Sequence, residues 1–261
     1  MTGGSRGIGF ATATALAERG ARVSLLARDR DRLADAAAQL ADDGAVVETA
    51  SADVADPRQT ARAIDGCVAT QGPADVLVTS AGMVHPGRFV ELDDDVFRRT
   101  MEVNYFGTLH AIRAVAPSMA DRGRGSIVGI SSAAGLFGVY GYTAYAASKF
   151  AVRGLLESLR QELRPHGVHV VCVFPADVDT DQLREENRLK PPETKAISGT
   201  VSPIEPQRVA DAIVAAIMRG RSHVTTDLAT AALDRLIGVA RGVVYSMVDR
   251  KVDQTRSDSK G

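Results

Sequence analysis

Short apolar runs alternate along this chain with longer segments in which apolar residues recur every three or four positions. The runs lie at residues 22–27, 45–50, 75–79, 125–130 and 168–174 and are rich in Val, Leu, Ile and Ala. Each is short enough to be a strand buried on both faces, as in a parallel sheet. The alternation therefore predicts an α/β fold with one doubly wound parallel sheet in a single domain.

The segments between these runs have the spacing of amphipathic helices. In residues 29–42, apolar residues such as Leu33 and Leu40 share one helical face. Another helix is predicted to begin at Asp56-Pro57, because proline suits the first turn of a helix. The remaining predicted helices span about 94–120, 143–164 and 206–220.

Three later segments have no clear place in the sheet. Residues 176–202 are polar, contain proline and show no regular period, which predicts a mobile segment that covers a site. Residues 228–250 predict an amphipathic helix that packs against its own domain, with a membrane surface or a partner subunit as the alternatives. Residues 253–261 are typical of a disordered polar tail, so the predicted domain is 1–252.

The composition excludes several classes of protein. The chain has 261 residues and a net charge of −1, with Lys and Arg spread along it, which argues against a nucleic-acid binder. Cys67 and Cys172 lie in separate apolar stretches without metal-ligand spacing. We therefore expect no metal and two buried reduced thiols, as in the cytoplasm. No apolar run reaches the roughly 18 residues of a membrane span, while association with the cytoplasmic face of a membrane stays open.

Residues 2–9 form a glycine-rich turn that leads directly into a helical pattern. Gly3, Gly7 and Gly9 would let the backbone approach a pyrophosphate, whose charge is met by the helix N-terminus. The spacing differs from G-x-G-x-x-G, and many glycine-rich turns bind nothing. On a Rossmann-type sheet, we interpret this turn as the phosphate-binding site for a dinucleotide.

Two arginines and one aspartate favour NADP(H) as that dinucleotide. Arg28 follows the 22–27 run, where an acidic residue would hold the ribose hydroxyl of NAD and an arginine suits the additional phosphate of NADP. Arg6 adds a second positive charge within the turn. Asp53, after the next run, can accept a hydrogen bond from the adenine amino group. Either arginine alone is more often a solvated charge.

Tyr145 and Lys149 lie four residues apart and therefore on one face of the predicted 143–164 helix. Tyr145 can donate the proton that a ketone needs when it receives a hydride, and we expect the charge of Lys149 to lower the pKa of Tyr145. Lys149 would also hydrogen-bond the nicotinamide ribose. On its own, such a pair is usually no more than a half-exposed helix face.

Two further polar residues support the catalytic interpretation. Ser132 follows the 125–130 run, at the edge where parallel sheets bind ligands, and its hydroxyl can hold a substrate carbonyl. Ser131 is the competing choice. Asn104 lies within the predicted 94–120 helix, from which it would order a water molecule between Lys149 and solvent.

These motifs together resemble the short-chain dehydrogenase/reductase family over almost the whole chain. The family pattern Thr-Gly-x-x-x-Gly-x-Gly matches residues 2–9, and the 13-residue step to the tyrosine favours Ser132 over Ser131. The resemblance implies that the family's catalytic Asn, Ser, Tyr and Lys are Asn104, Ser132, Tyr145 and Lys149.

One departure from the family lies at residues 79–82, which read Thr-Ser-Ala-Gly where the family has Asn-Asn-Ala-Gly. This change weakens a contact between a helix and a strand but does not alter any of the reacting groups. The resemblance implies NADP(H) contacts at Gly3, Ser5, Arg6, Gly7, Ile8, Gly9, Arg28, Asp53, Val54, Ala81, Gly82, Tyr145, Lys149, Pro175, Val178 and Thr180.

After the 168–174 run, the chain resembles one branch of the family, the 3-ketodihydrosphingosine reductases. Residues 175–180 read Pro-Ala-Asp-Val-Asp-Thr, and residues 185–191 contain Glu-Glu-Asn-Arg followed by Lys-Pro. The branch has Pro-Pro-Asp-Thr-Asp-Thr and Glu-Glu-Asn-Arg-x-Lys-Pro. This resemblance implies NADPH-dependent reduction of the 3-keto group of a lipidic amino ketone. The alternatives are another lipid, steroid or retinoid alcohol dehydrogenase, and a catalytically silent NADP-binding sensor or scaffold.

Two properties stay open at this point. Asp177, Asp179 and Asp181 would either attract the ammonium group of such a substrate or cap turns. A homo-oligomer is compatible with the sequence, with 94–120 and 143–164 as pairing faces.

The start of the chain is unusual for this fold. The glycine turn normally follows a central hydrophobic strand, yet here it begins at residue 2. We therefore expect the first strand to be missing from this chain, which would expose the edges of neighbouring strands. We further expect the start site to have been assigned too late, with a Val/Ile/Leu/Ala-rich run encoded upstream in frame.

Overall fold

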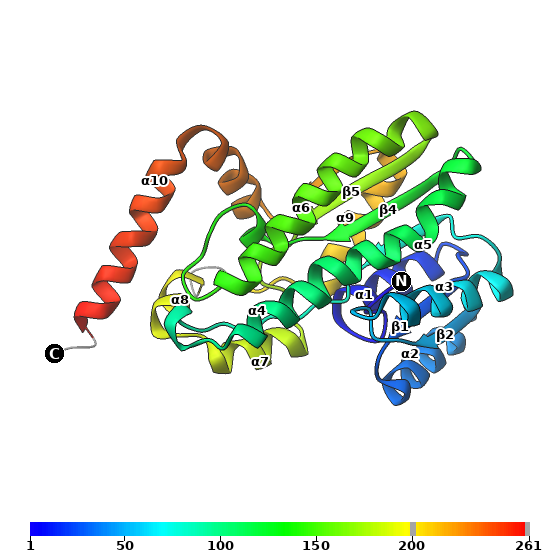
Figure 1. Cartoon of the computed structure of the whole chain (residues 1–261), viewed down its shortest axis with the longest axis horizontal. Coiled ribbons are helices and arrows are strands. Elements are labelled where there is room, and N and C mark those ends of the chain that lie inside the picture. The colour runs from blue at the N-terminus through cyan, green and yellow to red at the C-terminus, as the bar shows by residue number, and fades with distance from the viewer. Residues whose placement is uncertain (199–201, 259–261) are drawn as a thin grey trace.

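One parallel sheet organises the chain (Figure 1). The computed structural model describes residues 1–198 and 202–258. The sheet order is β2-β1, then Thr2, then β3-β4-β5-β6, because Thr2 bridges in parallel to Leu26 of β1 and to Thr79 of β3. This confirms the predicted doubly wound sheet. The strands are β1 Val23–Ala27, β2 Val47–Ser51, β3 Val76–Thr79, β4 Gly125–Ile130, β5 Val168–Phe174 and β6 His223–Thr225.

Met1 and Thr2 occupy the central position of the sheet. The backbone N–H of Thr2 donates to Val78 O at 3.0 Å, and that of Leu26 donates to Met1 O at 2.8 Å. Thr2 pairs with each of its two neighbouring strands through one isolated bridge. The two residues nevertheless supply backbone partners to both neighbouring strands, which covers part of the edge expected to be exposed.

The helices cover both faces of the sheet. Their bounds are α1 Gly7–Ala17, α2 Arg30–Asp42, α3 Pro57–Gln71, α4 Asp94–Met101, a π-helical turn Glu102–Phe106, α5 Gly107–Asp121, α6 Thr143–Leu163, α7 Asp181–Leu189, α8 Pro192–Ser198, α9 Pro206–Arg219 and α10 Leu228–Asp258. Short 3₁₀ turns lie at Phe89–Glu91, Ala133–Gly135 and Arg164–His166.

Strands β3, β4 and β5 are buried on both sides because their side chains alternate between two cores. In β5, Val170 and Cys172 pack with α3, α5 and α6, whereas Val171 and Val173 pack with α9. A third cluster joins β1 to α1 and α2 through residues such as Leu25. This two-sided burial explains why the strand runs read as continuously apolar.

Two predicted elements differ from the structure in an informative way. The expected helix 94–120 is interrupted at Glu102–Phe106, where the hydrogen bonds follow the wider π pattern. The expected mobile segment 176–202 instead contains α7 and α8 among its described residues, and residues 199–201 lie outside the described ranges. In α7 only Leu183 is buried, so the segment carries no hydrophobic period that a sequence reading can detect.

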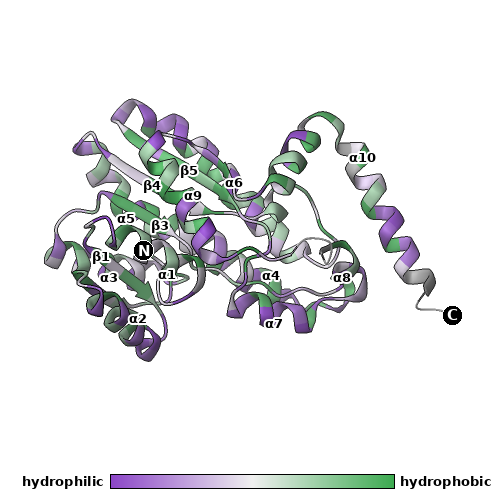
Figure 2. Ribbon diagram, turned by 180° about the vertical axis from the view of Figure 1, so that it is seen from behind, coloured by the Kyte–Doolittle hydropathy of each residue, from purple (hydrophilic) through white to green (hydrophobic). Residues whose placement is uncertain are grey.

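The C-terminal segment also differs from the prediction. Helix α10 continues through Asp258, so the described part of the expected polar tail is helical, while residues 259–261 lie outside the described ranges. Its backbone bends at Ala240, and beyond this point the helix changes direction (Figures 1 and 2) and contacts α8, where the ammonium of Lys251 donates to Ala196 O at 2.9 Å. Before the bend, Leu233 and Ile237 pack into the domain core, as the default interpretation expected. Within residues 1–198 and 202–258, none of the helices has the length and hydropathy needed to cross a bilayer.

Candidate active site

A cavity of about 1040 Å³ lies at the carboxyl ends of the parallel strands. Residues that follow β1, β2, β3, β4 and β5 line it, together with the glycine turn, the start of α6 and the segment that leads into α7. Fifteen of the sixteen predicted cofactor contacts line this cavity, and the predicted catalytic residue Ser132 lines it as well. The fifteen are Gly3, Ser5, Arg6, Gly7, Ile8, Arg28, Asp53, Val54, Ala81, Gly82, Tyr145, Lys149, Pro175, Val178 and Thr180. Gly9 and Asn104 are not among the lining residues.

The glycine turn brings bare backbone to one wall of this cavity. Gly3 and Gly7 have φ values of +65° and +57°, which disfavour residues that carry a Cβ. A Cβ on Gly9 would lie 2.2 Å from the carbonyl oxygen of Gly3. Gly9 therefore allows the backbone of the turn to pack closely, although it does not line the cavity itself. Helix α1 begins at Gly7 and directs its N-terminus to this wall. The arrangement suits the pyrophosphate of a dinucleotide, which needs close backbone approach and a positive field.

Positive side chains gather beside this turn. Arg28 is exposed and lines the cavity, and the guanidinium of Arg6 lies 3.8 Å from the carboxylate of Asp181 on α7. Arg32 also lines the cavity and pairs with Asp29 at 3.3 Å. Sequence reasoning missed Arg32, although its position in the first turn of α2, four residues after Arg28, could have indicated it.

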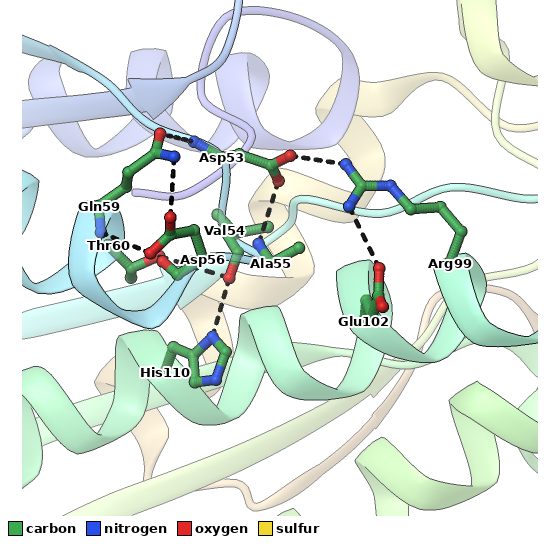
Figure 3. A network of polar contacts seen from close by, with 9 residues as sticks. All are labelled: Asp53, Val54, Ala55, Asp56, Gln59, Thr60, Arg99, Glu102 and His110. Atoms are coloured by element: carbon green, nitrogen blue, oxygen red, sulfur yellow. Dashed lines mark hydrogen bonds and ion pairs between the residues drawn. The ribbon is translucent and has the colours of Figure 1, made fainter.

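Asp53 is held by protein partners in the network of Figure 3. Arg99 of α4 donates to its Oδ2 at 2.6 Å, and the backbone N–H of Ala55 donates to its Oδ1 at 3.1 Å. Burial disfavours the charged carboxylate, but these hydrogen bonds outweigh it and hold the pKa of Asp53 below its usual range. The carboxylate is therefore fixed in place at the cavity wall, and its contact with adenine stays a prediction. Arg99 was missed because it is distant in sequence.

The two serines after β4 have different surroundings. Ser131 is buried, and its hydroxyl donates to the carbonyl of Lys149 at 2.9 Å, so it ties β4 to α6. Ser132 lines the cavity, hydrogen-bonds with Tyr145 and accepts from the backbone N–H of Ala134 at 3.1 Å. Of the two serines, Ser132 is therefore the one whose hydroxyl reaches Tyr145 in the cavity.

Tyr145 and Lys149 both face this cavity from α6. The ammonium nitrogen of Lys149 lies 5.5 Å from the ring centroid of Tyr145 and donates to the carbonyl of Ile130 at 2.9 Å. Burial lowers the pKa of Lys149 to about 8. The pKa of Tyr145 is raised, first by burial and then by the negative charge of Glu186, although its hydrogen bond with Ser132 lowers it. The direction of this shift is therefore opposite to the lowering that was expected from the charge of Lys149.

Asn104 lies in the π-helical turn and is 1% exposed. Its carboxamide oxygen accepts from the backbone N–H of Met83 at 2.8 Å, and its nitrogen donates to Met83 O at 2.9 Å and to Ser148 Oγ at 2.8 Å. The side chain thus fastens the segment after β3 to α6. The predicted role in ordering a water molecule near Lys149 stays a prediction.

The aspartates after β5 separate into two groups. Asp179 pairs with Arg184 at 3.6 Å, and Asp181 lies 3.6 Å from Arg184 as well as near Arg6. Asp177 instead lies 3.4 Å from the buried ammonium of Lys190, on the side of the cavity that contains Tyr145. Asp177 is therefore the aspartate of the three whose charge acts on Tyr145.

Comparison with known proteins gives one consistent result. The model of the short chain dehydrogenase family matches residues 1–190. The 3-ketodihydrosphingosine reductase of Bos taurus is 41% identical over 225 residues, which cover 84% of this chain and 68% of that protein. The 3-dehydrosphinganine reductase of Danio rerio has the same identity and coverage.

Solved structures have the same fold. A short-chain dehydrogenase/reductase from Burkholderia phymatum in complex with NAD superposes with a TM-score of 0.84 at 27% identity, covering 93% of each chain. A short-chain dehydrogenase from Sphingobium yanoikuyae in complex with NADPH has a TM-score of 0.79 at 30% identity and covers 94% of this chain and 93% of its own.

Proposed function

The chain belongs to the short-chain dehydrogenase family, and we propose that it reduces the 3-keto group of 3-ketodihydrosphingosine with NADPH as the electron donor. One observation supports the NADPH-dependent reduction of a ketone in general: Ser132, Tyr145 and Lys149 line the same cavity as a glycine turn that leads into the N-terminus of a helix. The relatives that share 41% of their residues with this chain over most of its length support the substrate.

The proposed roles of the side chains follow from their positions. When bound, NADPH supplies the hydride that reduces the carbonyl carbon. The hydroxyl of Ser132 holds the carbonyl oxygen by a hydrogen bond. Tyr145 transfers its phenolic proton to that oxygen as negative charge develops on it, so that ketone, hydride and proton together give the alcohol. Lys149 places a positive charge beside the tyrosine, which stabilises the phenolate that remains.

A direct assay tests this proposal. Purified full-length protein is mixed with NADPH and 3-ketodihydrosphingosine, and the loss of NADPH absorbance is followed together with formation of the amino alcohol. We expect turnover that depends on the amino ketone. NADPH oxidation with steroid or retinoid ketones but none with the amino ketone would favour the rival dehydrogenases. Binding of NADPH without oxidation by any of these ketones would favour a silent sensor.

The arginines at the glycine turn support NADP(H) over NAD(H) in the proposed function. Replacing Arg28 by Ala removes a charged partner for the additional phosphate, so we expect KM for NADPH to rise about 10- to 100-fold, with little change for NADH. Steady-state kinetics with both cofactors measures this ratio. Arg22→Ala provides the matched control, because Arg22 is also exposed but stands at the opposite end of β1. Equal losses with both cofactors would contradict the assignment.

We also propose that the protein is cytoplasmic and that α10 contacts the cytoplasmic face of a membrane. Both cysteines are free and buried, which suits a reducing compartment. Helix α10 carries Val239 at 91% exposure and Met247 at 61%, with further exposed apolar residues around them. A membrane surface would cover such residues and give access to a lipidic substrate.

Flotation with vesicles of phosphatidylcholine and phosphatidylserine tests this contact. We expect the wild-type protein to float with the vesicles and the Val239→Glu/Met247→Glu variant to remain at the bottom of the gradient. Met218→Glu on α9, which also replaces an exposed methionine, should float like the wild type. If the wild type does not float but elutes as a dimer that the double variant disrupts, α10 is a subunit interface. A homo-oligomer through the predicted pairing faces 94–120 and 143–164 is the remaining proposal, supported by exposed Phe106 in the π-helical turn and Phe150 in α6.

A further inference from the structure

Different charged side chains line the two ends of the cavity. Arg6, Arg28 and Arg32 line the end formed by the glycine turn and the start of α2, together with Asp29 and Asp53. Around Tyr145, the lining residues include the carboxylates of Asp177 and Glu186. A negatively charged cofactor suits the first end, whereas the second end favours a molecule that carries a positive charge.

Glu186 is fixed by two neighbours, and both of them contact the same carboxylate oxygen. Its Oε1 accepts from the hydroxyl of Tyr142 and from the ammonium of Lys190, the latter at 3.1 Å. For Oε2, the described residues supply no hydrogen bond, although the side chain is only 11% exposed. A carboxylate held in this way presents its second oxygen without the entropy cost of ordering a free side chain.

The charges around Glu186 do not balance. Lys190 is 2% exposed and lies between Glu186 and Asp177, 3.4 Å from the latter. Its single ammonium group therefore forms ion pairs with two carboxylates. Burial raises the pKa of Glu186, although hydrogen bonds from Tyr142 and Lys190 favour its charged form. Buried carboxylates gain stability from a full set of positive partners, and one further cation in the cavity would complete this set.

Glu186 is close enough to act on the proposed proton donor. The rings of Tyr142 and Tyr145 lie 5.8 Å apart, and Tyr142 is the residue that binds Glu186. After burial, the charge of Glu186 is the next cause that raises the pKa of Tyr145. A carboxylate in this place makes Tyr145 a poorer acid unless a cation neutralises it.

The residues of this group come from the stretch that departs from the general family pattern. Asp177 lies in the 175–180 segment, while Glu186 and Lys190 belong to the Glu-Glu-Asn-Arg and Lys-Pro motifs of 185–191. The roles of Ser132, Tyr145 and Lys149 do not explain why this stretch carries these charges. Their meeting beside Tyr145 indicates a role in the choice of substrate.

We propose that Glu186 is a specificity-determining residue that binds the ammonium group of an amino ketone whose amino group is on the carbon next to the carbonyl. The inference rests on the proposed function for the identity of the reacting ketone. Asp177 and Lys190 complete the ionic group around the bound ammonium. The same contact removes the unfavourable effect of Glu186 on Tyr145, so the proton donor becomes a better acid when an amino ketone is bound than when a neutral ketone is bound.

The test compares Glu186→Gln with the wild type on two matched ligands. One is a short-chain, water-soluble 2-amino-3-ketone, and the other has hydrogen in place of the amino group. For the variant we expect kcat/KM on the amino ketone to fall about 10- to 100-fold, as for loss of a charge-assisted hydrogen bond. On the neutral ketone we expect kcat to be unchanged or higher, because the negative charge near Tyr145 is gone. A residue with a merely structural role would lower both.

Glu157→Gln is the matched control, since Glu157 also forms an ion pair four residues along a helix, with Arg153 at 2.7 Å, and does not line the cavity. A second readout is calorimetric binding of the corresponding amino alcohol and of its neutral counterpart. Weaker binding of the amino alcohol alone to Glu186→Gln supports the inference, and equal binding to both proteins overturns it. This readout decides the inference even if the wild type consumes no NADPH with either ketone, a result that would contradict the proposed function instead.

Discussion

Replacing Tyr145 by Phe is expected to lower kcat for the ketone about 10³- to 10⁴-fold while leaving the binding of NADPH nearly unchanged. The phenolic hydroxyl is the proton donor in the proposed reaction, and general acid catalysis contributes about this much. Its pKa is raised by burial and by Glu186, so the group is protonated at neutral pH and available as an acid. The ring of Phe fills the same space, and Lys149 keeps its hydrogen bond to Ile130 O.

Single-turnover reduction and NADPH fluorescence titration separate the two effects of this variant. Tyr105→Phe is the control, because Tyr105 is a partly buried tyrosine in the π-helical turn that does not line the cavity. We expect its kcat to remain within about two-fold of the wild type, as for most substitutions outside a site. A Tyr145→Phe variant that retains more than about a tenth of kcat would mean that another group supplies the proton.

The sequence was sufficient to predict the strands and helices whose buried positions form a recognisable pattern of apolar residues. Strand β5 was predicted with the bounds it has, since Val168–Phe174 is buried along almost its whole length. Helix α6 differs from its prediction by one residue at its end. In contrast, the three-residue strand β6 was not predicted, because His223–Thr225 carries one buried apolar side chain and no period.

The cavity was predictable to the extent that it follows from topology. Strand ends in a parallel sheet meet at one edge, so residues such as Arg28 and Ser132 were placed together without any knowledge of contacts. The partners of these residues were not predictable. Arg99 meets Asp53 across 46 positions of sequence, and Asn104 meets Ser148 across 44. Such polar contacts leave no periodic trace in a sequence.

The pKa of Tyr145 shows why the remaining error arose. From the sequence, Lys149 was the one charge known to be near, and a positive neighbour lowers the pKa of a phenol. The structure adds Glu186, which reaches the same cavity from α7, a helix that has no apolar face to reveal it. The shift depends first on burial of the phenol and then on a residue 41 positions further along the chain, and the spacing of Tyr145 and Lys149 could supply neither.

Replacing Gly9 by Ala is expected to abolish cofactor binding although Gly9 does not line the cavity. A Cβ at this position would lie 2.2 Å from Gly3 O and 2.8 Å from the carbonyl carbon of Gly3. Both atoms belong to the backbone, so no side chain can move aside, and the turn itself must shift. We expect a loss of about 3 kcal/mol in the free energy of unfolding, the upper part of the range for an overpacked site.

The displaced turn would also fail to present Gly3 and Gly7 to a pyrophosphate. Thermal unfolding with and without NADPH measures both effects, since a ligand that binds the folded state raises Tm. We expect NADPH to raise the Tm of the wild type and to leave that of Gly9→Ala unchanged.

Gly154→Ala is the control, because Gly154 lies within α6 and a Cβ there meets nothing within 4 Å. That variant should gain up to about 1 kcal/mol from its higher helix propensity and respond to NADPH as the wild type does. If Gly9→Ala instead unfolds at the wild-type temperature and is stabilised by NADPH, the close contact between Gly9 and Gly3 does not shape the cofactor site.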